Sequence, residues 1–457
     1  PESGKTFSII IPFIKNFIDR GYTSITYDYK FPDLADIVYN HHLVNKRRIP
    51  QYKHQFHIIN LIDVEYSRRV NPLAPRYIED IDDCMETAEA LLQSLQKTVK
   101  TQGAQQFFTV SAINFLTAVF YFLSRFEDGK YSTLPHALSF INRSYEEIFD
   151  VLMKVPELDN IMSPFKSAYK TKTFGQLEGQ IGTVRVQMAP LATPKLFWVM
   201  SKDEVDLRIS SKEAPSHIII ANNAKKQSIN STSNALILNR LIQLINTKGN
   251  LPVVVAVDEL PTIYFHKIQN LIATARSNKV AVILGLQELP QLVESYGREV
   301  ANTITSVIGN VISGQARKKE TLDWLQQLFG KVKQIKTGVS ITKQQTTTSV
   351  NEHMDYLVPA SKIADQRTGE IVAKLAFGFN EKSANYNNAN TYNCRIDLDV
   401  AQIEREQKRY KDLPRTFRFK NNADKRRILA KNMASIKGDV EYIVQEATKK
   451  SKVRQHI

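Results

Sequence analysis

Apolar positions follow two periods along the chain, and their order predicts an α/β protein. Short β-rich runs lie at residues 24–30 and 56–61, and helical spacing separates them, which is typical of a βαβ layout. Four near-continuous apolar runs follow later, with helical segments between them, at residues 217–221, 253–257, 281–285 and 307–312. Strands buried on both faces have this pattern, so we expect a mainly parallel sheet covered by helices on both sides.

The stretch between these strand-rich parts has a spacing near 3.6 residues and few glycines, which predicts helices. The segments with this period are residues 88–98, 105–126, 133–153 and 173–188. We therefore predict an all-α domain at residues 78–197, inserted into a sheet domain formed by residues 1–77 and 198–400. Residues 231–246, 268–275 and 292–306 also have helical spacing and separate the later strands.

The remaining segments are more polar. Residues 331–351 are rich in Lys, Gln, Thr and Ser without a clear period, so they form either a polar hairpin or a mobile loop. Alternation returns at residues 370–379 and predicts a hairpin at the edge of the sheet. Residues 401–457 are charged and helical in character with few apolar anchors, and we interpret them as a basic helical C-terminal extension.

Composition and charge narrow the class of protein. The 457 residues include 61 Lys and Arg against 46 Asp and Glu, a net charge of +15, which suggests an acidic partner such as nucleic acid or an anionic membrane. Residues 401–457 hold 16 of these cations and 7 of the anions, so most of the excess lies there. Two cysteines, Cys84 and Cys394, exclude a disulfide scaffold and a thiolate zinc site.

No apolar run reaches the roughly 18–20 residues that span a bilayer. The longest, residues 112–123, contains Asn114 and Thr117 and is interpreted as a buried helix of a soluble bundle. No signal peptide is visible, but the chain begins inside a motif, so we expect its N-terminus and any membrane anchor to lie upstream. Three histidines, His41, His42 and His54, have no metal-site spacing and are expected at the surface.

The motif at the start of the chain predicts phosphate binding. Residues 1–6, ending in Ser3, Gly4, Lys5 and Thr6, match the second half of the P-loop pattern, with its first glycine expected upstream. Gly4 lets backbone N–H groups face phosphate oxygens, Lys5 would neutralise the β- and γ-phosphates of ATP, and Thr6 would ligate Mg²⁺. The helical residues that follow would place phosphate at a helix N-terminus. Half a motif also occurs in ordinary turns.

A second acidic motif strengthens this prediction. The apolar run at 253–257 ends in Asp258 and Glu259, the Walker B pattern. Asp258 would hold Mg²⁺ through water or Thr6, and Glu259 would polarise the attacking water. An exposed Asp-Glu pair at a strand exit is the alternative, but both motifs together favour nucleotide hydrolysis.

Two further polar residues belong to the same hypothesis. Gln287 follows the strand that we expect beside the Asp258 strand, where an amide can contact the γ-phosphate or its water. Satisfaction by a neighbouring loop is the alternative. Arg276, just before that strand, could reach a neighbouring subunit's nucleotide as an arginine finger, or it could be a solvated helix-end residue.

The order of these elements resembles the TraD/TraG-like coupling proteins of conjugative and type IV secretion systems, which are membrane-anchored, RecA-like hexameric ATPases. The resemblance covers residues 1–379. Tyr27-Asp28-Tyr29-Lys30 stands where the family has Asp-Pro-Lys-Gly-Glu. The other matching segments are Asn71-Pro72-Leu73, Asp206-Leu207-Arg208, Asp258-Glu259-Leu260-Pro261, Ala275-Arg276, Gly285-Leu286-Gln287, Gln291-Leu292 and Tyr296-Gly297.

The resemblance implies a role for each matching residue. Lys5 and Thr6 take the phosphate and Mg²⁺ roles, Asp258 and Glu259 the Walker B and catalytic roles, Gln287 the sensor role and Arg276 that of the arginine finger. This sequence departs from the pattern at Glu2, which puts a carboxylate in the phosphate loop, and at Tyr29 and Phe31, which replace Pro and Gly. The roles of Asp28 and Lys30 are therefore less well supported.

The resemblance also implies a function. The chain would be the cytoplasmic ATPase domain of a coupling protein at the bacterial inner membrane, a homo-hexamer that delivers DNA–relaxase or protein substrate to type IV secretion channel components. The basic extension would contact DNA, membrane or relaxase, or it would simply be solvated and packed along a neighbour. A DNA pump of the FtsK/HerA type is an alternative that would lack the large helical insertion, and a non-hydrolysing adaptor that recruits substrate is another.

Overall fold

The computed structural model describes residues 4–98, 110–342, 345–376 and 390–454. The chain forms two compact units. The large unit consists of Ile14–Leu284 and Tyr410–Ile457, and the small unit consists of Pro1–Phe13 and Gly285–Arg409.

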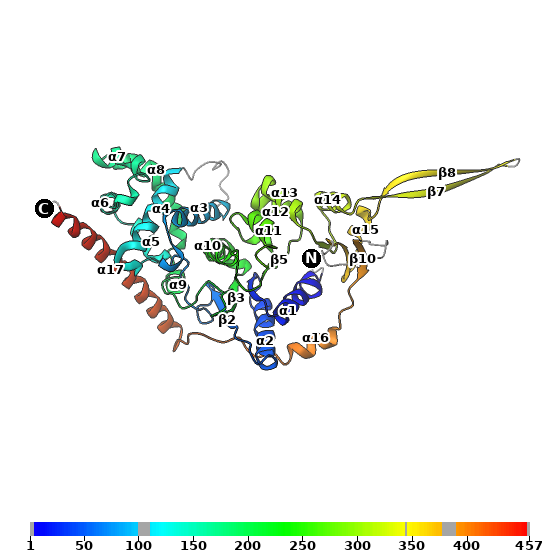
Figure 1. Ribbon diagram of the computed structural model, residues 1–457, viewed down its shortest axis with the longest axis horizontal. Helices are drawn as coiled ribbons and strands as arrows, with labels where there is room; N and C mark the ends of the chain where they lie inside the picture. The colour runs from blue at the N-terminus through cyan, green and yellow to red at the C-terminus, as the bar shows by residue number, and fades with distance from the viewer. Residues whose placement is uncertain (1–3, 99–109, 343–344, 377–389, 455–457) are drawn as a thin grey trace. The chain divides into compact units, whose positions relative to one another are not determined.

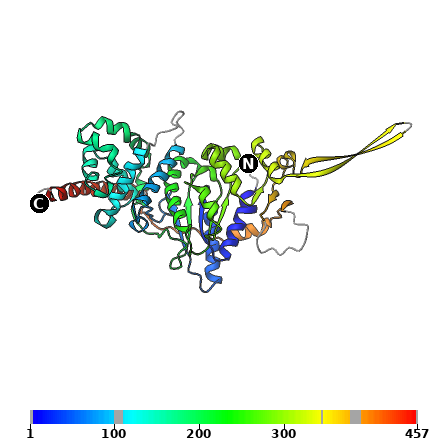
Figure 2. The same cartoon turned by 45° about the horizontal axis from the view of Figure 1, so that its top comes forward.

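The large unit is built on a five-stranded parallel sheet with the order β2-β3-β1-β4-β5 (Figure 2). Its strands are β1 (Thr23–Asp28), β2 (Gln55–Asn60), β3 (Ser216–Ala221), β4 (Val253–Val257) and β5 (Val280–Leu284). Every residue of β1, β3 and β4 is buried, which explains the continuous apolar runs of the latter two, whereas most of β5 is half-buried. The predicted α/β fold with a mainly parallel sheet is therefore confirmed.

Helices precede or connect these strands along the chain. They are α1 (Ile11–Asp19), α2 (Asp33–Arg48), α10 (Gln227–Ile245) and α11 (Ile268–Thr274). The last two correspond to the segments predicted at residues 231–246 and 268–275. Because all five strands are parallel, their carboxyl ends lie at one edge of the sheet, and the loops after them can meet there.

A helical region lies between β2 and β3 along the chain (Figure 1). Its helices are α3 (Ile81–Thr98), α4 (Val110–Arg125), α5 (Leu134–Ile141), α6 (Tyr145–Leu152), α7 (Lys166–Lys170), α8 (Phe174–Met188) and α9 (Pro194–Val199). The segment with helical spacing at residues 133–153 forms two helices, α5 and α6, because Ser144 and Glu147 form a capping box that starts a new helix. Residues 112–123 lie within α4, which is largely buried. The domain boundaries proposed above remain predictions.

A buried arginine joins α10 to the start of this helical region. Arg240 is 3% exposed, and its guanidinium donates to the carbonyl oxygens of Pro72 and Tyr77 at 3.0 and 3.1 Å. It also donates to the hydroxyl of Thr87 on α3 at 2.9 Å. A planar group with five donors can satisfy several acceptors at once, so this side chain ties three separate segments together.

The C-terminal segment is an integral part of the large unit. After an extended stretch, α17 (Asn422–Arg454) packs against α5, α6 and α9 (Figures 1 and 2). Its apolar residues Leu429, Ile436, Val440, Ile443 and Val444 are buried. As expected, the apolar anchors are few, but these five lie between positions 429 and 444 and share one face of the helix, so they suffice to pack it.

The small unit has a sheet of its own, with the antiparallel order β10-β9-β6. These strands are β6 (Val311–Ser313), β9 (Glu370–Lys374) and β10 (Thr391–Arg395). The unit's helices are α12 (Leu289–Tyr296), α13 (Arg298–Val307), α14 (Lys319–Phe329), α15 (Ala360–Ala364) and α16 (Val400–Gln407). Its core includes Ala316, Leu325, Phe329, Val358, Ile363 and Val372.

This second sheet corrects two predictions. Residues 307–312 do not form a strand of the parallel sheet, because α13 extends to Val307 and β6 pairs with β9. Within the alternation at residues 370–379, Glu370–Lys374 form β9 of this sheet and not an edge of the parallel one, and residues 377–379 lie outside the described residues.

A long two-stranded ribbon is the remaining feature of the small unit. Strands β7 (Lys331–Thr342) and β8 (Gln345–Tyr356) pair antiparallel along their whole length (Figure 1). Of the two alternatives for residues 331–351, the polar hairpin is therefore the one observed. Within the residues that the structure covers, no helix combines the length and apolar character required for a membrane span.

Candidate functional site

The phosphate-loop residues begin a helix. Gly4 has a φ of +67°, and a Cβ there would lie 3.3 Å from Thr368 Cγ2 and 3.4 Å from Ser8 Oγ, so glycine suits both the conformation and the close approach. Lys5 precedes a π-helical turn, Thr6–Ile10, which continues directly into α1. Lys5 and Thr6 thus stand at a helix N-terminus, as predicted, where amide groups favour anions. Ser3 and Glu2 lie outside the described residues.

The carboxyl ends of β1 and β4 bring two aspartates together in the large unit. Tyr27 and Val257 are partners in the parallel register, and Asp28 and Asp258 directly follow them. Asp28 is 1% exposed and accepts hydrogen bonds from the amides of Leu34 and Ala35, at 3.0 and 2.9 Å, at the start of α2. Burial raises the pKa of Asp28 to about 7, and the charge of Asp258 adds to this effect.

Other groups at this edge are shifted in the same direction. Burial raises the pKa of Asp33, and Asp258 raises it further. Burial and then the charge of Glu259 raise the pKa of Tyr29. The edge is thus rich in negative charge, which a divalent cation would offset. Among the described residues, no group of three or more His, Cys, Asp and Glu side chains could hold a metal by itself.

A buried hydrogen-bond network holds the turn after Glu259. The hydroxyl of Thr262 donates to the carbonyl oxygen of Glu259 at 2.7 Å and lies 3.2 Å from the hydroxyl of Tyr27. Asn222, just after β3, donates to the Tyr27 hydroxyl at 2.9 Å, and Ser231 on α10 donates to the Thr262 carbonyl at 2.8 Å. These residues position Glu259 through its backbone. The sequence pattern did not identify the residues of this network. The only feature that pointed to them was their position as polar residues just beyond apolar strands.

Arg276 and Gln287 flank β5, which pairs with β4 as expected. Arg276 is exposed in the turn before β5, whereas Asp258 follows the opposite end of β4. The length of a five-residue strand, about 16 Å, therefore separates Arg276 from the acidic edge of its own chain. Gln287 is exposed three residues beyond β5 and belongs to the small unit.

Two segments shared with the resembling family have structural partners. Asn71 donates to the carbonyl oxygen of Ser132 at 2.9 Å and accepts from the amide of Leu73 at 3.1 Å. Asp206 accepts from the Tyr77 hydroxyl at 3.0 Å and from the Arg208 guanidinium at 2.8 Å, and these partners help to lower its pKa to about 2 against the opposing effect of burial. Both residues secure connections between the sheet and the helical region.

The early histidines are not surface residues. His42 is 4% exposed, and His41 and His54 are half-buried. His42 and His54 contact the fully buried His217, whose ring nitrogens lie 2.8 Å from Ser24 Oγ and 2.6 Å from Tyr52 Oη. These rings lie by the amino ends of the strands, away from the acidic edge. The prediction failed because their packing depends on β3, far away in the sequence.

Comparisons with known proteins agree with this architecture. The chain resembles the bacterial conjugative coupling protein TrwBdeltaN70, unbound, with 11% identity and a TM-score of 0.63, covering 91% of this chain and 84% of that chain. It also resembles plasmid coupling protein TrwB in complex with the ATP analogue ADPNP, with 10% identity and a TM-score of 0.60, covering 91% of this chain and 84% of that chain. For TrwB in complex with ADP and Mg²⁺, the identity is 10% and the TM-score 0.54, and the match covers 86% of this chain and 86% of that chain. These identities support the fold alone.

Sequence comparison identifies the family. No curated protein sequence matches the chain. A family profile described as type IV secretory system conjugative DNA transfer matches residues 1–358, more than three quarters of the chain. The chain therefore belongs to the type IV secretory system conjugative DNA transfer family.

Proposed function

We propose that this chain is the ATPase core of a conjugative coupling protein, which uses ATP hydrolysis to deliver DNA–relaxase or protein substrate into a type IV secretion channel. The observation that carries the proposal is the acidic edge of the parallel sheet. There Asp258 and Glu259 follow the buried strand β4, next to the buried Asp28 of β1. Family membership and the nucleotide complexes of the similar TrwB structures support it.

Each candidate residue has a defined role in this proposal. Backbone amides of Ser3 and Gly4 and the ammonium of Lys5 bind phosphate oxygens of ATP. Thr6 and Asp258 would hold Mg²⁺, because Mg²⁺ commonly binds one or two carboxylates together with substrate phosphates and water. When bound, the metal offsets charge on the phosphates.

The remaining residues act on the attacking water and the transferred group. Glu259 orients and polarises the water, and the network through Thr262 and Tyr27 fixes the backbone from which it projects. Gln287 senses the γ-phosphate. Because Arg276 lies by the opposite end of the sheet from Asp258, it would serve the nucleotide of a neighbouring subunit.

The proposal includes an assembly and a location. The active form is a homo-hexamer at the cytoplasmic face of the bacterial inner membrane, with DNA, relaxase or secreted protein and the channel components as partners. The helical region between β2 and β3 favours a coupling protein over a DNA pump of the FtsK/HerA type, which would not require such an insertion.

ATP turnover by the full-length protein tests the proposal. Glu259→Gln should lower kcat by about 100-fold or more and change ATP affinity little, because it removes the group that acts on water. Lys5→Ala should instead weaken ATP binding. Glu157→Gln, at an exposed position of the helical region, serves as the matched control. If the parent protein hydrolyses ATP no faster than Glu259→Gln, the motor function is refuted in favour of a non-hydrolysing adaptor.

A further inference from the structure

The segment that leads into α17 is fastened to the large unit by its apolar and backbone groups. Leu413 is buried, and the rings of Phe417 and Phe419 contact Trp198. The amides of Thr416 and Phe417 donate to the carbonyl oxygen of Glu65 at 2.7 and 3.1 Å. The chain is therefore held in an extended path over this surface, although it has no regular secondary structure between α16 and α17.

The cations of this segment face solvent. Arg415, Arg418 and Lys420 are exposed. Arg418 and Lys420 alternate with the anchoring residues Phe417 and Phe419, because successive side chains of an extended chain point to opposite sides. The Arg415 guanidinium lies over the Tyr66 ring, 5.5 Å from its centre, in a cation–π contact. The anchors thus hold the cations at defined positions on the surface.

The first half of α17 continues this arrangement. Its buried residues Leu429 and Ile436 fix the helix against its own chain, whereas Arg426, Lys431 and Lys437 are exposed. We call the six exposed cations Arg415, Arg418, Lys420, Arg426, Lys431 and Lys437 the basic strip.

Few carboxylates lie in the same stretch of chain as the basic strip. Between residues 410 and 437 the acids are Asp412 and Asp424, and Asp424 is bound to Arg427 at 2.8 Å. Lys425 is paired with Asp63 at 3.0 Å. Neither ion pair includes a member of the strip. The charges of Glu65 and Asp63 act on Arg415, and that of Asp424 acts on Lys420, but most of the strip's charge remains available to a partner.

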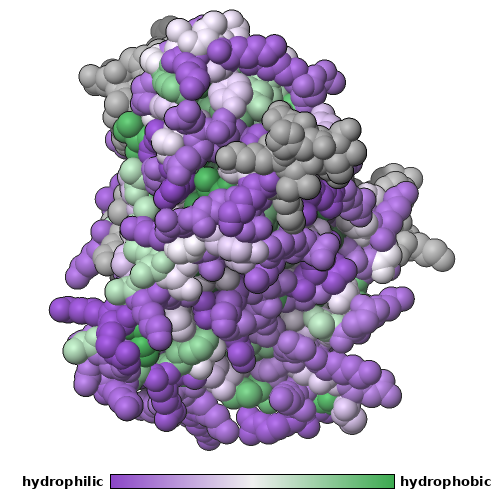
Figure 3. Space-filling view, turned by 90° about the vertical axis from the view of Figure 1, so that its left-hand side faces the viewer, coloured by the Kyte–Doolittle hydropathy of each residue, from purple (hydrophilic) through white to green (hydrophobic). Residues whose placement is uncertain are grey.

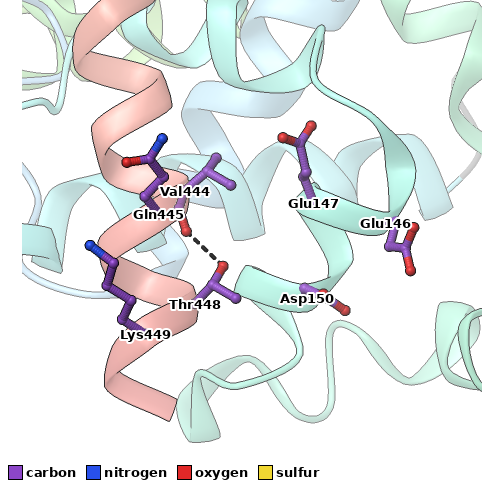
Figure 4. A pocket seen from close by; sticks show the side chains of 7 residues that line it. All are labelled: Glu146, Glu147, Asp150, Val444, Gln445, Thr448 and Lys449. Atoms are coloured by element: carbon purple, nitrogen blue, oxygen red, sulfur yellow. Dashed lines mark hydrogen bonds between the residues drawn. The ribbon is translucent and has the colours of Figure 1, made fainter. Parts of the chain in front are cut away.

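The later half of α17 faces acidic residues of another helix. Its later half, with Val444, Gln445, Thr448 and Lys449, lines a pocket whose other wall is Glu146, Glu147 and Asp150 of α6 (Figure 4). Acids there face the helix, so the strip ends before this pocket. The side of the molecule that bears α17 is predominantly hydrophilic (Figure 3).

We propose that the basic strip is a binding surface for the phosphate backbone of nucleic acid. Its Arg and Lys groups follow one another along an anchored segment, and they do not enclose a pocket for a single anion. This arrangement suits a polyanion whose phosphates are contacted without base readout. Three of its six members are arginines, whose planar forks bind phosphate oxygens in pairs. The inference rests on the proposed function in supplying DNA as the partner, but it concerns a surface outside the ATPase residues.

The chemistry of the strip favours nucleic acid over an anionic membrane. An amphipathic helix that binds membranes presents an apolar face to the lipid, whereas the apolar face of α17 is buried against α5, α6 and α9. Among the described residues 410–437, no large hydrophobic side chain is exposed that could insert into a bilayer.

Salt-dependent binding of the 457-residue chain to a 30-nucleotide single strand and to its duplex tests the proposal. The strip variant combines Arg415→Gln, Arg418→Gln, Arg426→Gln and Lys431→Gln. Its affinity at 50 mM salt should fall at least tenfold, and the slope of log K against log salt should become shallower by up to about 3.6 for duplex, since each phosphate contact contributes about 0.9. The matched control neutralises four other exposed cations: Arg20→Gln, Lys154→Gln, Lys170→Gln and Lys248→Gln.

Three results would overturn the proposal: no DNA binding by the parent chain, an unchanged affinity and slope in the strip variant, or an equal loss in the control. Vesicles with 30% phosphatidylglycerol form a third arm, and loss of vesicle binding with retained DNA binding would assign the strip to membranes instead. Unchanged thermal stability excludes misfolding. DNA-free ATPase activity of the full-length protein separates the two claims. Strip-dependent DNA binding without turnover would refute only the ATPase function, and turnover with strip-independent DNA binding would refute only the strip.

Discussion

The hydroxyl groups of Tyr27 and Thr262 lie 3.2 Å apart, which links the end of β1 to the turn that follows Glu259. Tyr27 is fully buried, and burial raises its pKa to about 12, so it stays protonated at neutral pH. The same hydroxyl accepts from Asn222. The contact thus connects three segments at the acidic edge and gives Tyr27 a positioning role for Glu259.

Tyr27→Phe tests this role. The variant keeps the ring but leaves the amide of Asn222 and the hydroxyl of Thr262 with one partner fewer, at a cost of about 1–2 kcal/mol in unfolding free energy. We expect kcat for ATP to fall several-fold with little change in KM, measured by steady-state kinetics. Tyr442→Phe removes a hydrogen bond to Glu127 in the helical region and serves as the control. An equal loss of stability in both variants with unchanged kcat would leave Tyr27 only a structural role.

The position of Arg276 leads to a prediction about assembly. Because it lies by the amino end of β5, it should act on the nucleotide of another subunit. Arg276→Ala and Glu259→Gln should each be inactive alone, yet mixing them should recover activity, since each supplies what the other lacks. With random mixing in a ring, roughly a quarter of the interfaces would be intact.

The mixing experiment needs a reference for exchange between assemblies. Glu259→Gln mixed with itself in a second preparation should stay inactive, and parent mixed with Glu259→Gln should show dilution of activity. If the two inactive variants remain inactive although the dilution shows that subunits exchange, Arg276 does not act between subunits.

Local pattern was sufficient to locate the five strands of the parallel sheet and the motif residues. The apolar run at 253–257 followed by Asp258 places β4 and its carboxylate directly, because a buried strand and its end are features of consecutive residues. The start of the helix at Lys5 and Thr6 is likewise set by consecutive residues. Whether these residues act as proposed is a question for the variants above.

Features that depend on distant partners could not be read from the pattern. The strand β6 belongs to a second sheet because it pairs with β9, some 60 positions later. The burial of His42 requires His217, and the network around Thr262 requires Tyr27 and Asn222. Periodicity records which face of an element is apolar but not which element covers it.

Arg240→Met should strongly destabilise the large unit. The substitution removes a guanidinium that donates to Pro72, Tyr77 and Thr87, and it leaves these buried acceptors without that donor. We expect a loss of about 3 kcal/mol in the free energy of unfolding, measured by urea denaturation. Arg405→Met, on the exposed face of α16, should change it by less than about 0.5 kcal/mol. Equal effects would show that Arg240 does not tie these segments together.

Acid should destabilise the protein from near pH 6.5 downward through its buried histidines. Burial, followed by the charge of Lys46 for His42 and of Arg68 for His57, lowers both pKa values to about 4. Burial likewise lowers the pKa of His54 and, by a larger amount, that of His217, although the nearby Asp19 partly counteracts the same effect at His41.

The sign follows from the proton balance of the two states. Between pH 6.5 and 4 the unfolded chain binds protons at His42 and His57 that the folded protein does not, so stability falls as pH falls, by up to about 1.4 kcal/mol per unit for each group. Asp28 opposes this trend, because its folded pKa of about 7 exceeds its ordinary 3.8 and its contribution is lost as pH rises. Thermal unfolding from pH 8 to 4 should therefore show a shallower acid slope for His57→Gln than for the parent. Parallel curves would contradict the assignment to this histidine.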